Sequence, residues 1–128
     1  MDILTHQAID PELCGRALQV ETGYSRVQLL TTRAMAADHT GLVHGGFIFG
    51  LADYAAMIAV NHPNVVLGAA DVKFLKPVRV AASVIAEARV EEVQGKKHWV
   101  AVSVSNNDEI VFQGMFTCFV LGKHVLKE

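Results

Sequence analysis

The sequence predicts an α+β domain in which a six-stranded antiparallel sheet wraps around one long central helix. The run 46–61 is apolar at helical spacing, whereas the stretches on either side alternate polar and apolar residues at the period of a strand. Helices and strands do not alternate as they would in a parallel sheet, so we expect antiparallel pairing. The 128 residues suit a single domain, 1–128.

Two strands are expected before the helix. Residues 1–15 are predicted to form a short helix or loop, with Pro11 suited to a first helical turn. The alternating residues from Ala17 predict a strand that ends at Gly23, and 25–35 predicts a second extended strand, with a hairpin turn at Gly23-Tyr24 between them.

The helix is expected from about Gly46 to Asn61. Phe47, Leu51, Tyr54 and Ile58 recur at helical spacing, and His62-Pro63-Asn64 ends the pattern. Four further strands are predicted after it, at 65–75, 82–93, 98–105 and 110–121, with turns at 95–97 and 106–108.

Asp53 is the only charged residue in this helix. A helix that is apolar on all sides is usually buried, and burying an ionised carboxylate is costly unless it is paired, hydrogen-bonded or protonated. The positions one turn away are Phe49, Gly50, Ala56 and Met57, so no cation in the helix offsets that cost. An exposed Asp, or one bonded to a distant backbone amide, is the alternative, but the isolation of this carboxylate favours a functional site.

Composition excludes several classes of protein. A net charge of −2 at pH 7 gives no basic surface for nucleic acid. Cys14 and Cys118 are too few for a disulfide framework, and the histidines lack paired ligand spacing, so we expect no metal. The first residues do not resemble a signal peptide and the apolar helix is short for a membrane span, so we expect a cytoplasmic protein that does not contact membranes. The 52% of hydrophobic residues indicates an additional buried surface, such as a subunit interface.

Residues 41–56 resemble the signature of hotdog-fold thioesterases, most closely the PaaI-like branch. The matching pattern is His-Gly-Gly at 44–46, a helix, and an acid eight residues after the first glycine. Residues 71–78 resemble the family's strand that ends in proline. The resemblance implies a hotdog fold over nearly the whole chain, in a homodimer or a dimer of dimers, with the active site between two subunits.

Asp53 lies about 12 Å along the helix axis from Gly45, too far for both groups to touch one carbonyl. The absence of side chains at Gly45 and Gly46 lets a ligand approach the backbone closely. The resemblance implies that the Gly45 N–H and the helix dipole bind the thioester oxygen. Asp53 of the other subunit would then attack, either directly or through a water, and both routes stay open.

Further residues have expected roles at this site. His44 is expected to order the loop before the helix, with contact to the thioester as the alternative. The resemblance places Asp38 where the family often has an asparagine that positions water. Candidates for the phosphates of coenzyme A (CoA) are Lys73, Lys76, Arg79 and the Lys96-Lys97 pair, although a solvated strand face is the commoner role for any one of them.

We therefore predict an acyl-CoA thioesterase that releases a free acid and CoA, with no prosthetic group and with CoA as part of the substrate. One alternative is a hotdog hydratase or dehydratase, although the dehydratase signature of a His near a Pro-Gly pair is absent before the helix. The other is a non-catalytic acyl-CoA sensor. Residues 1–24 are too short and too poor in basic residues for the DNA-binding domain that such sensors carry.

Overall fold

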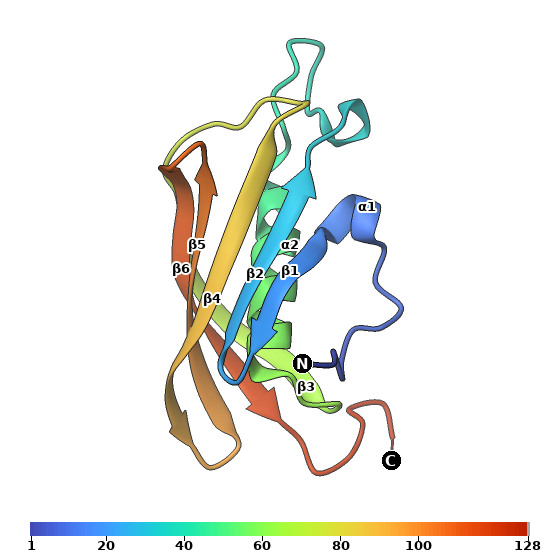
Figure 1. Cartoon of the computed structure of the whole chain (residues 1–128), viewed down its shortest axis with the longest axis vertical. Coiled ribbons are helices and arrows are strands. Elements are labelled where there is room, and N and C mark those ends of the chain that lie inside the picture. The colour runs from blue at the N-terminus through green and yellow to red at the C-terminus, as the bar shows by residue number, and fades with distance from the viewer. Residues whose placement is uncertain (128) are drawn as a thin grey trace.

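The computed structural model describes residues 1–127 and confirms the predicted architecture: one six-stranded antiparallel sheet curls around helix α2 (Figure 1). The helices are α1 (Pro11–Cys14) and α2 (Gly45–Val60), with a 3₁₀ turn, η1 (Arg33–Met35). The strands are β1 (Arg16–Glu21), β2 (Tyr24–Leu30), β3 (Val65–Phe74), β4 (Ser83–Gln94), β5 (Lys97–Asn106) and β6 (Glu109–Val120). They lie in the order β1-β2-β4-β5-β6-β3, so β1 and β3 are the edge strands.

Helix α2 lies in the concave face of the sheet, which explains why its sequence is apolar all round. The buried Ser25 hydroxyl of β2 donates a hydrogen bond of 2.7 Å to the Ala55 carbonyl and fixes the helix to the sheet. The helix ends at Asn61, whose backbone is left-handed. The Asn61 side chain donates to the Asp2 carbonyl and accepts from the Leu4 N–H, both at 2.8 Å, which ties the N-terminal arm to the helix end.

The strand expected over 25–35 ends at Leu30, and residues 33–35 turn instead of extending, so that prediction was wrong in its second half. The cause is Thr31, whose buried hydroxyl donates to the Arg79 carbonyl at 2.8 Å and accepts from the Ala82 N–H at 2.9 Å. These contacts come from a distant segment and carry no local sequence signal. The hairpin turn also lies one residue earlier than predicted, because Tyr24 already pairs with Glu21.

The aromatic side chains of β6 join the sheet to the helix. The ring of Phe49 in α2 lies 5.4 Å from that of Phe116 and 6.5 Å from that of Phe112, measured between ring centres. Phe112 also contacts the ring of Phe74, at the end of β3, with 5.1 Å between centres. Within residues 1–127, no helix is long and apolar enough to cross a membrane.

Candidate active site

The start of α2 is held in place by two neighbouring segments. The His44 N–H donates to the Met35 carbonyl at 2.9 Å, and the Val43 N–H donates to the Val78 carbonyl at 2.8 Å. The N–H groups of Gly45 and Gly46 have no acceptor among residues 1–127. Free amides at the positive end of a helix form a site for an oxygen atom that carries or develops negative charge.

Both glycines have an aromatic ring close by. A Cβ atom at Gly45 would lie 3.1 Å from Cε1 of Phe74, and one at Gly46 would lie 3.0 Å from Nε2 of His44. Both distances are tighter than ordinary van der Waals contact, so a side chain at either position would have to displace an aromatic ring. The lack of a side chain at Gly45 therefore lets the Phe74 ring lie close to the first turn of α2, whereas the ring beside Gly46 belongs to the exposed His44.

A pocket of about 320 Å³ adjoins this turn. Its walls are mainly apolar and include Val43, Gly45, Ile48, Phe74 and Pro77. Lys76 is the one charged residue among those that the structure places in its wall. The pocket can thus hold a hydrocarbon group beside the free amides, with a cation at its wall.

Asp53 lies two turns further along α2. Its Oδ1 atom is buried and has no hydrogen-bond partner among residues 1–127, so the alternative of an Asp bonded to a distant backbone amide is wrong for this oxygen. Burial raises the pKa of Asp53 from its ordinary 3.8 to about 6. A buried, unpaired carboxylate oxygen is rare in folded proteins, and it makes Asp53 a candidate base or nucleophile whose pKa lies near neutrality.

His44 and Asp38 lie near the helix start in sequence but make only local contacts. The His44 ring is exposed and packs edge-on against Phe47, with 6.1 Å between ring centres, and its side chain caps no helix amide. Asp38 accepts hydrogen bonds from the N–H and the hydroxyl of Thr40, which lower its pKa below the ordinary value. Burial alone raises the pKa of Asp53, so Asp38 of the same chain does not contribute to that shift.

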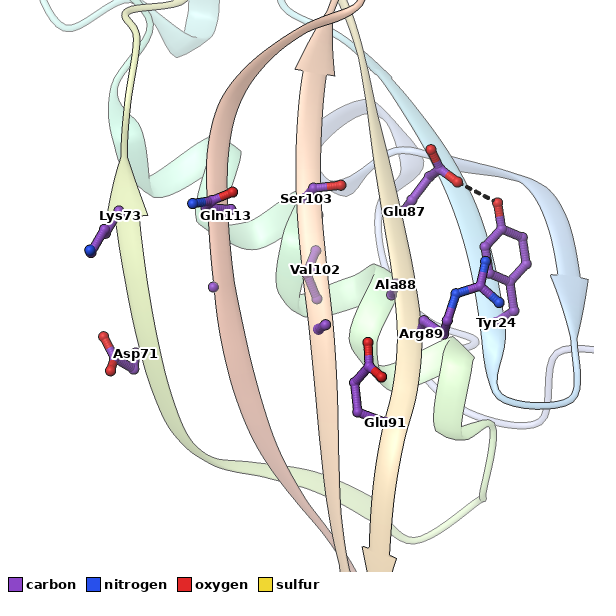
Figure 2. Close-up of a pocket in the computed structure, with 12 residues that line it drawn as sticks. Tyr24, Asp71, Lys73, Glu87, Ala88, Arg89, Glu91, Val102, Ser103 and Gln113 are labelled. Carbon is purple, nitrogen blue, oxygen red and sulfur yellow. Dashed lines mark hydrogen bonds between the residues drawn. The ribbon is translucent and has the colours of Figure 1, made fainter.

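Three of the predicted phosphate contacts, Lys73, Lys76 and Arg79, separate in the structure. Lys76 lines the pocket at Gly45, and the Arg79 backbone pairs with Leu42 in the loop before α2. Lys73 lies elsewhere, at a hollow of about 530 Å³ on the face of the sheet turned away from α2 (Figure 2).

This outer hollow is polar and is lined by charges of both signs. Tyr24 donates a 2.6 Å hydrogen bond to Glu87, and the Arg89 guanidinium lies 4.6 Å from the centre of the Tyr24 ring. Neither Gly45 nor Asp53 lines it, so the hollow is separate from the candidate site.

Sequence reasoning missed the role of Phe74. The end of β3 returns to the start of α2 through the curvature of the sheet, which places the Phe74 ring on Gly45. The only sequence signal is the position of Phe74 three residues before Pro77, and that spacing does not predict a contact with the helix.

Cysteine nucleophiles and metal ions are two other possible sources of chemistry. Cys118 is fully buried, and burial followed by the charge of Asp53 raises its pKa to about 12, so it is a protonated thiol and a poor nucleophile. Among residues 1–127, no three His, Cys, Asp or Glu side chains gather closely enough to hold a metal ion.

Solved structures share this fold. An uncharacterized protein from Pyrococcus horikoshii superposes with a TM-score of 0.98 at 49% identity, over 99% of this chain and 98% of that one. A mutant of the phenylacetic acid degradation protein PaaI from Thermus thermophilus superposes with a TM-score of 0.78 at 25% identity, over 85% of this chain and 95% of that one.

Curated relatives are longer proteins. The chain is 54% identical over 122 residues to a methylthioribose-1-phosphate isomerase from Aquifex aeolicus, covering 94% of this chain but 27% of that protein. It is 28% identical over 118 residues to the transcription factor FapR from Caldanaerobacter subterraneus, covering 91% of this chain and 59% of FapR. This chain therefore spans only part of each relative.

The sequence model of the thioesterase superfamily matches residues 40–112, which contain all of α2, Asp53 and Phe74. This match covers more than half of the chain, and the curled sheet around α2 agrees with the hotdog fold that the sequence motif implied. The chain belongs to the thioesterase superfamily.

Proposed function

We propose that this protein is an acyl-CoA thioesterase whose active site combines Gly45 of one subunit with Asp53 of another. One observation carries the proposal: the same helix presents unpartnered amides at its start and an unpartnered buried carboxylate oxygen two turns later. The two groups are about 12 Å apart along the axis, so one chain does not bring them to one carbonyl. In a dimer, the second copy would bring its Asp53 carboxylate to the Gly45 amide of the first copy, and its Gly45 amide to the Asp53 of the first copy.

The edge of the sheet supports this pairing of two copies. Strand β3 is a ten-residue edge strand, and an edge of that length presents unpaired backbone groups to another chain. Pairing two β3 strands about a two-fold axis extends the sheet and runs the two α2 helices in opposite directions. Gly50 lies between Gly46 and Asp53, and a Cβ atom built there meets nothing within 4 Å, so this face of α2 has room for a partner.

In the proposed reaction the Gly45 N–H stabilises the oxygen of the thioester carbonyl as negative charge develops on it. Asp53 of the partner either attacks the carbonyl carbon itself or takes a proton from an attacking water. Direct attack breaks the carbon–sulfur bond and leaves a mixed anhydride, which water then hydrolyses to free acid. In the water route the proton that Asp53 takes passes to the departing sulfur, whereas direct attack releases CoA as a thiolate that solvent then protonates. Lys76 is the predicted cation best placed to contact CoA.

The test is release of free thiol from aryl, short, medium and long acyl-CoAs by the wild type and by Asp53→Asn. We expect turnover on one class, reduced at least 10³-fold in the variant, because both routes need the carboxylate. Circular dichroism and sedimentation of the variant control for fold and assembly. Turnover that survives in Asp53→Asn would refute the assignment of Asp53. A change in enoyl absorbance without thiol release would indicate the hydratase alternative.

The similarity to the transcription factor FapR favours a second candidate, a domain that binds acyl-CoA without hydrolysing it. The two functions differ in one measurement. Saturable binding of an acyl-CoA, with no thiol released over hours by the wild type, would favour the binding domain. Release that depends on Asp53 would exclude it.

A further inference from the structure

A second pocket, of about 480 Å³, lies where the β4–β5 turn meets the segment that follows β6. Its lining includes Lys96, Lys123, His124 and Lys127, with Leu121 and Val125 as apolar members. We call it the basic pocket. The Val120 N–H donates to the Lys96 carbonyl at 2.8 Å, so the backbone joins the two segments that supply the lysines.

The charge of this pocket is opposite to that of the whole chain. The protein carries a net charge of −2, yet three lysines line one pocket. Within residues 1–127 the one salt bridge is Arg16–Glu12, so none of these lysines forms a salt bridge with a described carboxylate. Lysine ammonium groups are suited to phosphate oxygens, and a cluster of them attracts anions.

The neighbouring Lys97 is engaged differently. Its ammonium lies 5.1 Å from the centre of the Trp99 ring and 5.8 Å from that of Phe119. Of the Lys96-Lys97 pair predicted from the sequence, only Lys96 lines the basic pocket.

The position of the basic pocket along β3 connects it to the candidate active site. The Leu121 N–H donates to the Asn64 carbonyl at 3.2 Å, so the pocket lies at the Val65 end of β3. Gly45 and its pocket lie at the Phe74 end, which a ten-residue strand places about 30 Å away within one chain. Figure 1 likewise shows the C-terminal segment at the end of the sheet away from the loop that precedes α2.

Antiparallel pairing of two β3 edges would remove the distance between the two kinds of pocket when they belong to different subunits. In such a dimer the Val65 end of one strand would lie beside the Phe74 end of the other, which would bring the basic pocket of one subunit toward the Gly45 pocket of its partner. A ligand that extends from one pocket to the other would have a phosphate-bearing end and an apolar end.

We propose that the basic pocket binds the phosphate groups at the nucleotide end of CoA, while the thioester lies in the Gly45 pocket of the partner subunit. This assignment rests on the proposed function for its ligand. It adds Lys123, His124 and Lys127 to the binding surface and assigns the two ends of one substrate to different subunits.

The experiment measures binding of CoA itself by calorimetry, which does not depend on turnover. We expect Lys123→Gln/Lys127→Gln to bind CoA at least tenfold more weakly than the wild type, with a loss that diminishes at high salt. Lys123→Arg/Lys127→Arg keeps both charges and should bind within about twofold of the wild type. Arg16→Gln/Arg26→Gln removes two charges from β1 and β2, at the other side of the sheet, and should also bind like the wild type.

A second readout separates this proposal from the proposed function. If the protein hydrolyses acyl-CoA, Lys123→Gln/Lys127→Gln (the Gln variant) should have a higher KM for an acyl-CoA and the same kcat. Its KM for the matching acyl-pantetheine, which lacks the nucleotide, should equal that of the wild type. Equal CoA binding by the Gln variant and the wild type would refute the basic pocket and leave hydrolysis standing. Lysine-dependent CoA binding without thiol release would refute hydrolysis and keep the pocket.

Two further outcomes would also overturn the assignment. Pyrophosphate that binds as tightly as CoA would show a general anion site and contradict the CoA assignment. A wild type that does not bind CoA would refute the basic pocket, whatever the outcome of the thiol-release assay.

Discussion

Asp53 links the stability of the chain to its charge state. Burial raises the pKa of this carboxyl from 3.8 to about 6, so the folded state holds the proton more tightly than the unfolded state. Between these two values the unfolded chain binds fewer protons, and stability therefore falls as the pH rises. Above about pH 6 the full cost of the buried charge is present.

Asp53→Asn should therefore stabilise the protein at pH 8 by about 3 kcal/mol, on the scale of 1.36 kcal/mol for each pKa unit between 3.8 and about 6. At pH 4 most of the gain should be lost, since the wild-type carboxyl is then almost fully protonated in the folded state and only the ionisation of the unfolded chain still costs stability. Urea unfolding of the variant and the wild type measures the difference in their free energy of unfolding at each of the two pH values. Equal stability of variant and wild type at pH 8 would show that the buried charge costs nothing.

The same pKa sets the expected pH dependence of catalysis. Both routes use the ionised carboxylate, so kcat/KM should rise with pH and level off above an inflection at about 6. Initial rates of thiol release between pH 4.5 and 8 provide the profile. A profile that is flat across pH 6 would argue against Asp53 as the reacting group.

At the scale of elements, the start of α2 depends on its contact with the end of β3. Gly45→Ala favours the helix by propensity but places a Cβ atom 3.1 Å from Cε1 of Phe74. We expect the fold to be retained and kcat to fall at least tenfold, because the displaced ring moves into the Gly45 pocket. Adding Phe74→Leu to this variant removes the ring edge and should restore part of kcat, as measured by thiol release. Wild-type kcat in Gly45→Ala alone would show that the contact is unimportant for the reaction.

The helix and most strands could be predicted because their periodicities are local properties of the sequence. Asp53 was found in the same way, as one charge in an apolar run. The strand expected to reach Met35 stops at Leu30 because Thr31 bonds to Arg79 and Ala82, about fifty residues away. Lys73 and Phe74 were harder to place, because the facing of β3 depends on its register with β6 and on the irregularity between Leu67 and Ala69.

At the scale of the whole molecule, a site shared between subunits predicts complementation. Asp53→Asn and Gly45→Val each inactivate one half of every site. In a mixed dimer one site is doubly defective and the other is intact, so an equimolar, fully exchanged mixture should regain about a quarter of wild-type activity, given random pairing of subunits. Thiol release before and after co-refolding measures this. A mixture as inactive as its components would place both groups in one chain.

Gly50 tests the interface without touching the chemistry. A Cβ atom at Gly50 has open space within one chain, so Gly50→Leu should fold normally and yet obstruct the approach of a second α2. We expect the dimer to dissociate at least tenfold more readily, measured by sedimentation over a range of concentrations, with Gly50→Ala as the milder control. An unaffected dimer would place the interface on another face.

The order of strands in the sheet also fixes a sequence of events during synthesis. Strand β3 follows α2 directly along the chain, but its one neighbour in the sheet is β6, the last strand to leave the ribosome. Until residues 109–120 have emerged, β3 has no partner within its own chain and no fixed register. In the proposed dimer the β3 edge that would join two subunits is therefore completed last, so nascent chains would have to finish folding before they could pair.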